Sequence, residues 1–168
     1  MKFIRKYFWF LPAVLWMAVI FSMSNETGSQ SSSVSLKVTQ TMVRAIESIR
    51  GGSSEDSENL VRKLHPYVRK AAHMTEYAVL FVLLFLSFIF STVATRSAAV
   101  SIVISFLYAC SDEIHQTFVS NRAGQMTDVC IDMTGVLAAV AIVLFIYSGW
   151  QIRRERKKAF QKRTDKVK

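Results

Sequence analysis

The chain has 168 residues, of which 51% are hydrophobic, and its 21 basic and 12 acidic residues give a formal net charge of +9. With 12 Phe and only 2 Pro, the composition excludes a disordered chain and is unusual for a small soluble domain. It predicts a membrane protein.

Four apolar stretches predict an all-α integral membrane protein that forms a single domain over residues 1–168. A bilayer core of about 30 Å requires roughly 20 residues of helix. The transmembrane helices are expected at about residues 7–23, 66–94, 98–117 and 128–150, and the second and third reach this length only when a polar end turn is included. One such stretch alone could be a buried helix of a soluble protein, but four in one small chain favour the membrane.

The first stretch has an alternative interpretation. Residues 1–24 have the layout of a cleaved signal peptide, with a basic start, an apolar middle and small residues at Ser22 and Ser24. The apolar middle, which contains Trp9 and Trp16, is long for a signal peptide, so a retained helix is expected. Under either alternative the second helix starts outside the cell.

A polar extracytoplasmic loop is expected over residues 24–65. Its tracts SNETGSQSSS and GGSSEDSEN are typical of flexible, hydrated segments. Between them, apolar residues recur at helical spacing, which predicts a short amphipathic helix on the outer membrane surface. These residues are Val34, Val38, Met42, Ala45 and Ile49.

The second helix is expected to begin at Pro66, because proline suits the first helical position and disfavours helix in the residue before it. Its polar residues lie in its first three turns. The third helix becomes polar only from Ser111 onward, and the fourth carries Asp128 and Asp132 in its first turns. Because successive helices alternate in direction, these three polar ends are expected on one side of the membrane.

The distribution of basic residues predicts which side that is. They gather at both termini and at Arg96, between the second and third helices. Cytoplasmic segments are enriched in Lys and Arg, so both termini, Arg96 and a basic tail at residues 151–168 are expected in the cytoplasm. The tail sequence RRERKKAFQKR could instead bind nucleic acid, but a basic cluster beside a membrane helix more often meets anionic lipid. Membrane lipids, and not nucleic acid, are the expected partners.

The polar helix ends then lie at the outer leaflet. A charge near the middle of a membrane helix costs about 2.5 to 3.5 kcal/mol, so these side chains are expected to face one another around a hydrated pocket open to the outside. Helical spacing places Glu113 well off the polar stripe of its helix and His115 at the edge, which makes them the weaker members. The expected ligand-binding residues are Arg69, Lys70, Glu113, Gln116, Arg122, Asp128 and Asp132.

The cationic residues of this set would suit a phosphate or carboxylate ligand. Candidate proton-transfer residues, and hence candidate catalytic residues, are His73, Glu76 and Asp112. The alternative interpretation is that the polar side chains only pair with one another and cap helices inside the bundle.

A metal site is the third interpretation. His73 and Glu76 have i, i+3 spacing, which would allow a divalent ion between helices. The cationic side chains in the same layer favour an anion instead, so neither a metal nor a cofactor is expected. The two cysteines could form a disulfide, although buried free thiols are expected. These are Cys110 and Cys130.

Three segments together resemble the VanZ-like family, small bacterial membrane proteins named for a teicoplanin-resistance determinant. They read FSMSNETGSQSSSVS after the first helix, RKAAHMTEYAVL in the second, and SDEIHQTFVSNRAGQMTDVCIDMTG across the third and fourth. Asp132 stands where many members carry asparagine. The residues that match the family pattern are Arg69, Lys70, His73, Glu76, Tyr77, Asp112, Glu113, Gln116, Phe118, Arg122, Asp128 and Gly135.

The resemblance implies a protein of the bacterial cell envelope, in the plasma membrane, with a link to teicoplanin, a lipoglycopeptide that acts at the outer membrane face. Three functions stay open: a pocket that binds an anionic lipid-linked or cell-wall ligand or the drug's lipid anchor, an enzyme acting on a phosphate-bearing lipid or cell-wall precursor, and a small carrier. The sequence shows no activated Ser or Cys nucleophile, which weighs against the enzyme. Four helices without internal repeats weigh against the carrier.

Overall fold

The computed structural model describes residues 8–50, 54–90, 92–122 and 124–165, and every regular element within these ranges is a helix. The predicted all-α class is confirmed. Residue 7 of the predicted first helix, residues 51–53 of the predicted loop, residue 91 and the tail residues 166–168 lie outside the described residues. The elements are the 3-10 turn η1 (Phe8–Phe10) and the helices α2 (Leu11–Ser24), α3 (Gly28–Arg50), α4 (Ser54–Ile89), α5 (Ala94–Gln116) and α6 (Met126–Asp165).

Three helices of the described chain, α4, α5 and α6, are long and apolar enough to cross a membrane. The chain bends by 107° between α2 and α3, and the number of spans rises to four if these two helices together count as one broken span. Alone, α2 has 14 residues, or about 21 Å at 1.5 Å per residue, which is short of a 30 Å bilayer core. The protein is a multi-pass membrane protein of three to four spans.

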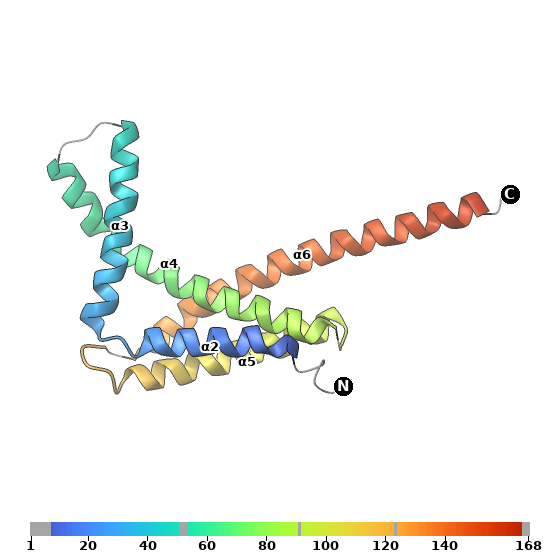
Figure 1. The fold of residues 1–168 in the computed structure, drawn as a ribbon, viewed down its shortest axis with the longest axis horizontal. Coiled ribbons are helices and arrows are strands. Elements are labelled where there is room, and N and C mark those ends of the chain that lie inside the picture. Colours follow the sequence, from blue (N-terminus) through green and yellow to red (C-terminus); the bar gives the residue numbers. More distant parts are fainter. Residues whose placement is uncertain (1–7, 51–53, 91, 123, 166–168) are drawn as a thin grey trace.

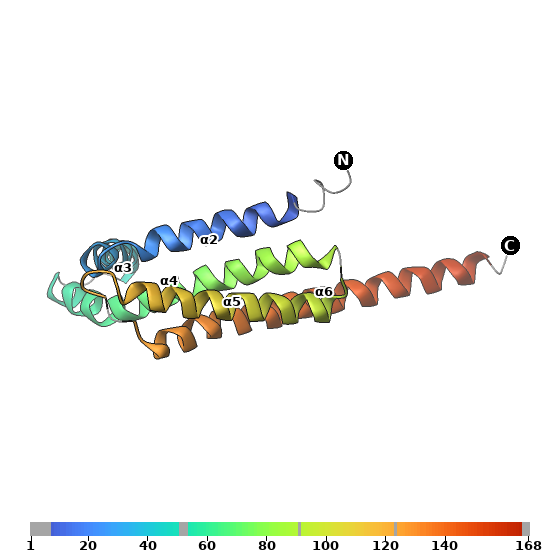
Figure 2. The same ribbon diagram turned by 90° about the horizontal axis from the view of Figure 1, so that it is seen from below.

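The helices run along one another, with α3 crossing their ends (Figures 1 and 2). The α4–α5 connection, the start of α2 and the far end of α6 all lie at the opposite end from α3 (Figures 1 and 2). The two ends of the described chain therefore share one end of the bundle, which is the arrangement that the predicted topology requires. Which side of the membrane that end faces stays a prediction.

The predicted extracytoplasmic loop is largely helical, and α4 begins at Ser54 and not at Pro66. Proline removes one backbone hydrogen bond from a helix interior, but tertiary contacts hold α4 together across it. The N-terminal part of α4 packs along α3 (Figure 1). Next to the proline, the His65 ring lies 2.9 Å from Ser35 Oγ and 3.2 Å from the Ser32 carbonyl.

The predicted amphipathic helix is present as α3, and it is longer than expected at 23 residues. Its buried face carries Ser35, Thr39 and Val43. The apolar stripe singled out in the sequence points the other way, since Val34 is 53% exposed and Met42 is 48% exposed.

The predicted basic tail is also helical, because α6 continues without a break to Asp165. Its last turns project beyond the other helices (Figures 1 and 2).

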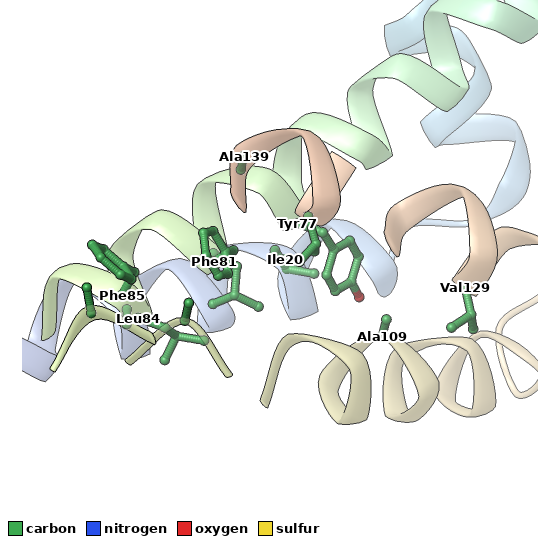
Figure 3. Close-up of a cluster of buried hydrophobic side chains, with 13 residues drawn as sticks. Ile20, Tyr77, Phe81, Leu84, Phe85, Ala109, Val129 and Ala139 are labelled. Atoms are coloured by element: carbon green, nitrogen blue, oxygen red, sulfur yellow. The ribbon is translucent and has the colours of Figure 1, made fainter. Parts of the chain in front are cut away.

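A core of large side chains lies around α4, which contacts α2, α3, α5 and α6. Figure 3 shows Tyr77 and Phe81 of α4 between residues of the neighbouring helices. On α5 the buried face carries small residues at every fourth position, Ser97, Ser101 and Ser105, which lets the backbones approach closely. The outward faces are apolar, with Leu107, Phe145 and Ile146 at least 60% exposed, as expected for surfaces that meet lipid.

Candidate functional site

A cavity of about 350 Å³ lies at the α3 end of the bundle, between α4, α5, α6 and the α5–α6 loop. The first turns of α6 and the last turn of α5 meet there with the middle of α4. Most of the lining side chains are polar or charged. They are Pro66, Arg69, Lys70, His73, Glu113, Gln116, Asn121, Arg122, Gln125, Asp128, Ile131 and Asp132.

Eight of the ten predicted site residues line this cavity. They are Arg69, Lys70, His73, Glu113, Gln116, Arg122, Asp128 and Asp132. Of the other two, Glu76 lines an adjoining cavity of about 120 Å³ that also contacts Arg69, His73 and Arg122. Asp112 lines neither cavity.

Arg122 is the cation whose geometry is most specific. It follows Asn121, whose backbone is left-handed with φ 59°, a conformation that asparagine tolerates better than most residues. One guanidinium nitrogen, Nη2, donates to the Met23 carbonyl at 3.1 Å. The other two nitrogens, Nε and Nη1, are buried and have no hydrogen-bond partner among the described residues.

The electrostatic setting of Arg122 is mixed. Burial has the largest effect and lowers the pKa of its guanidinium, and the positive charge of Arg69 lowers it further, whereas the negative charges of Asp112, Glu26 and Glu113 raise it. A guanidinium nevertheless stays protonated at physiological pH. A buried cation with two free donors lowers its free energy most by meeting an anion.

The lining of the same cavity also carries three carboxylates, on Glu113, Asp128 and Asp132. Glu113 Oε2 accepts a hydrogen bond from the Gln125 backbone N–H at 2.9 Å, which ties the end of α5 to the start of α6. Asp132 is only 3% exposed, and its Oδ1 is a buried acceptor that no described residue reaches.

The cations and carboxylates around the cavity do not pair. His73 pairs with Glu76 at 3.4 Å beside the cavity, and Lys158 pairs with Glu155 at 2.8 Å on the exposed tail. Three cations and three carboxylates thus line one cavity, and none of them neutralises another directly. Opposite charges held apart at a partly buried site are the reverse of what stability alone would favour.

The His73–Glu76 pair lies where the two adjoining cavities meet. Glu76 Oε2 lies 3.4 Å from His73 Nδ1, and the side chains are 12% and 27% exposed, respectively. The Glu76 backbone is fixed from the other side, because its carbonyl accepts from Trp16 Nε1 at 2.9 Å. This carboxylate–imidazole pair has the residue types that proton transfer requires.

Asp112 and Gln116 form a buried pair beneath the cavity. Gln116 Nε2 donates to Asp112 Oδ2 at 2.9 Å and lies 3.4 Å from Ser24 Oγ of α2. Gln116 reaches the cavity and Asp112 does not. The structure therefore fits Asp112 as a support for Gln116 better than as a residue that meets a ligand.

Helical spacing placed Glu113 off the polar stripe of its helix, but Glu113 is 7% exposed and lines the cavity. His115 lies outside the cavity, with its ring tilted against that of Phe21 at a centroid distance of 4.8 Å and its Nε2 2.9 Å from Asn25 Oδ1. Helical spacing alone describes one inward face, whereas α5 packs against α2, α4 and α6 and so has several covered faces.

The α5–α6 loop contributes more to the cavity wall than the predicted residue Arg122. Asn121 and Gln125 also line the cavity. Gly124 makes the tight path of this loop possible, since a Cβ there would overlap the Glu113 carbonyl. The tract NRAGQ, with asparagine and glycine three positions apart, is the signal for such a turn.

A larger cavity, about 620 Å³, lies between α3 and the first turns of α4. None of the buried polar atoms that lack a partner belongs to its lining residues. The cavity between α4, α5 and α6 is therefore the stronger candidate for a functional site.

No group of three or more His, Cys, Asp or Glu side chains in the described part of the chain is arranged to hold a metal ion. Cys110 and Cys130 are both free thiols, as expected, but neither is buried: Cys110 is partly exposed and Cys130 is exposed.

Comparison with known proteins gives one match. The family model described as VanZ/LLP1 matches residues 8–147, which include every residue of the cavity wall. No curated protein and no solved structure matches the chain.

Proposed function

Since the chain belongs to the VanZ/LLP1 family, we propose that it is a protein of the bacterial plasma membrane that binds an anionic lipid-linked or cell-wall ligand in the cavity at the α3 end. Binding there lowers susceptibility to lipoglycopeptides such as teicoplanin. The family name and the membrane helices support the setting, and the chemistry of the cavity supports the ligand class.

The observation that carries the ligand class is the unpartnered guanidinium of Arg122. Its Nε and Nη1 are buried without a partner in the described chain. A phosphate or carboxylate accepts from a guanidinium through two parallel hydrogen bonds, which are stronger than neutral ones. Arg69 and Lys70 line the same cavity and add two more positive charges.

The side of the membrane is part of the proposal. The cavity lies at the end opposite the basic tail of α6 (Figures 1 and 2). If the tail is cytoplasmic, as the positive-inside tendency favours, the cavity opens toward the outer leaflet. Lipid-linked cell-wall precursors and lipoglycopeptides meet on that side.

A membrane-embedded enzyme acting on a phosphate-bearing lipid or cell-wall precursor is the second candidate, and one observation favours it. His73 lines the cavity with Nδ1 beside Glu76, and a carboxylate that orients an imidazole is the usual support of a general base. In that case Arg69 and Arg122 would hold the phosphate while His73 moves the proton.

The test is a susceptibility assay with matched variants. The wild-type chain, expressed in a sensitive bacterium, should raise the teicoplanin concentration needed to stop growth more than the vancomycin concentration. Arg122→Gln should abolish this protection. Arg62→Gln is the control, because Arg62 is an exposed cation that bonds Asn59 at 2.9 Å and does not line the cavity.

Membrane levels of each variant are measured by immunoblot, so that loss of protein is not mistaken for loss of function. Full protection by Arg122→Gln at normal protein level would exclude the cavity as the site. Profiles of lipid-linked precursors separate the two candidates: an enzyme changes them and loses that change in His73→Ala, whereas a binding protein leaves them unchanged.

A further inference from the structure

Two residues of opposite charge in the cavity lining have buried polar atoms that lack hydrogen-bond partners, and both restrict which ligand can bind. One is the guanidinium of Arg122, with two buried donors that have no partner among the described residues. The other is the carboxylate of Asp132, which is 3% exposed and has one buried oxygen in the same condition. Both residues line the one cavity, and no ion pair joins them.

We propose that the cavity binds a zwitterionic group, a phosphate ester that also carries a protonated primary amine. The phosphate meets Arg122, Arg69 and Lys70, and the amine meets Asp132 with Asp128 and Glu113. This inference rests on the proposed function, since it names the chemical class of the anionic ligand.

Charge balance favours this class over a simple anion. The three cations and three carboxylates of the lining sum to zero formal charge when His73 is neutral. A phosphate alone would satisfy Arg122 but would leave the buried Asp132 acceptor without a donor and would add negative charge near three carboxylates. An amine alone would leave Arg122 without an acceptor. Only a ligand with both groups supplies a partner to both buried residues.

The cations and the carboxylates of the lining come from different segments of the chain, which favours a ligand that carries its two charges on different atoms. The cations come from α4 and the α5–α6 loop, and the carboxylates come from the end of α5 and the start of α6. Glu113 is fixed by the Gln125 backbone and Arg122 by the Met23 carbonyl. These bonds keep the opposite charges from collapsing onto each other, so the cavity is preorganised for a bridging ligand.

Size limits the ligand to a headgroup. The volume of about 350 Å³ is at the small end of ligand sites, which run from roughly 300 to 1,000 Å³. It suits a phosphate joined to a short amino-alkyl arm. A lipoglycopeptide core is far larger, so the drug itself is not the occupant.

A primary amine is favoured over a quaternary one. Asp132 Oδ1 needs an N–H donor, and a quaternary ammonium has none. Cation binding without donors generally uses a cage of aromatic rings. No Phe, Tyr or Trp is among the lining residues of this cavity.

The test measures binding to the full chain in lipid nanodiscs by native mass spectrometry. Three lipids with the same acyl chains are compared: phosphatidylethanolamine, phosphatidic acid and phosphatidylcholine. The first should bind about tenfold or more tightly than the third, because a charge-assisted hydrogen bond is lost in the third. The two variants used are Asp132→Asn and Arg122→Gln, with Arg62→Gln as the control.

Asp132→Asn should weaken phosphatidylethanolamine binding about tenfold and should not weaken phosphatidic acid binding, because it removes one of the negative charges that repel a simple phosphate. Arg122→Gln should weaken the binding of both lipids. If phosphatidylethanolamine and phosphatidic acid bind equally and Asp132→Asn changes neither, the zwitterionic ligand is excluded, but the proposed anion site is not. If Arg122→Gln changes no lipid, the proposed function fails as well. Thermal unfolding of each variant shows whether it is folded.

A soluble probe shows whether the ligand is a lipid headgroup or a soluble molecule with the same phosphate and amine groups. If O-phosphoethanolamine displaces the bound lipid, the headgroup alone is sufficient and a soluble ligand fits. If the lipid stays bound at a saturating concentration of the probe, the acyl chains contribute and the source is the membrane. Either result supports the phosphate-plus-amine chemistry, provided that the Asp132→Asn effect is present.

Discussion

The same two helices, α4 and α6, meet in two very different ways. Where they cross, the backbones touch, because Gly135 of α6 lies against the Met74 carbonyl of α4 and leaves no room for a Cβ. Fewer than two turns away, toward α3, they are held apart around a cavity lined by charged residues. In Figure 1 the crossing lies between this end and the point where α6 leaves the bundle.

The α4–α6 crossing contributes mainly to stability, whereas the cavity end has the features of a functional site. The crossing buries apolar surface, with Val136 fully buried and Ala139 7% exposed beside Phe81 (Figure 3). Close contact between small residues is a main source of helix association in membranes. At the cavity end, one oxygen of Asp132 and two nitrogens of Arg122 are buried and have no hydrogen-bond partner among the described residues, which costs stability. A feature that costs stability in an otherwise well-packed bundle is expected at a functional site.

The largest expected effect comes from breaking the crossing. Gly135→Leu would place a side chain where the Met74 backbone already lies, so the helices must separate along their length. We expect a loss of about 3 kcal/mol or more in unfolding free energy, measured by thermal unfolding in detergent. Gly149→Leu is the control, because nothing lies within 4 Å of a Cβ there. Equal destabilisation by both would show that the crossing does not hold the helices together.

The sequence predicted the packed and the polar parts of the bundle unequally well. The last three spans and the meeting of their polar ends followed from one constraint, since lipid tolerates neither free backbone groups nor isolated charges. The first predicted span did not follow in the same way, because α2 alone is too short and the chain bends by 107° after it. The continuation of α4 through Pro66 did not follow, because it depends on packing against α3, whose position no local pattern encodes. The role of Glu113 also depends on which helices surround α5.

The next largest expected effect concerns the stability that the protein loses by burying Asp132 in the cavity wall. Asp132→Asn removes a buried charge whose Oδ1 has no partner in the described chain, so we expect unfolding free energy to rise by about 1 kcal/mol while ligand binding falls. Asp128→Asn is the control, since Asp128 is only partly buried and its replacement should change stability little. A clear loss of stability in Asp132→Asn would mean that the carboxylate holds the bundle together, and the contrast between the two regions would fail.

A smaller effect is expected where α2 joins the packed region. Tyr108 Oη donates to the Met17 carbonyl at 2.6 Å, so Tyr108→Phe should cost about 1 kcal/mol of unfolding free energy and leave the cavity intact. Tyr67→Phe is the matched control, because Tyr67 is 72% exposed. Protection against teicoplanin should be normal in both variants. Loss of protection in Tyr108→Phe at normal protein level would show that the position of α2 controls the cavity.

The smallest effect separates two histidines that lie on neighbouring helices. His115 stacks on Phe21 and contacts Asn25, outside the cavity, whereas His73 lines the cavity beside Glu76. His115→Ala removes a partly exposed contact, so we expect less than about 0.5 kcal/mol of destabilisation and unchanged protection in the susceptibility assay. His73→Ala, tested alongside, should lower protection at equal membrane level. If protection instead requires His115 and not His73, the functional surface is the one around His115, Phe21 and Asn25 and not the cavity.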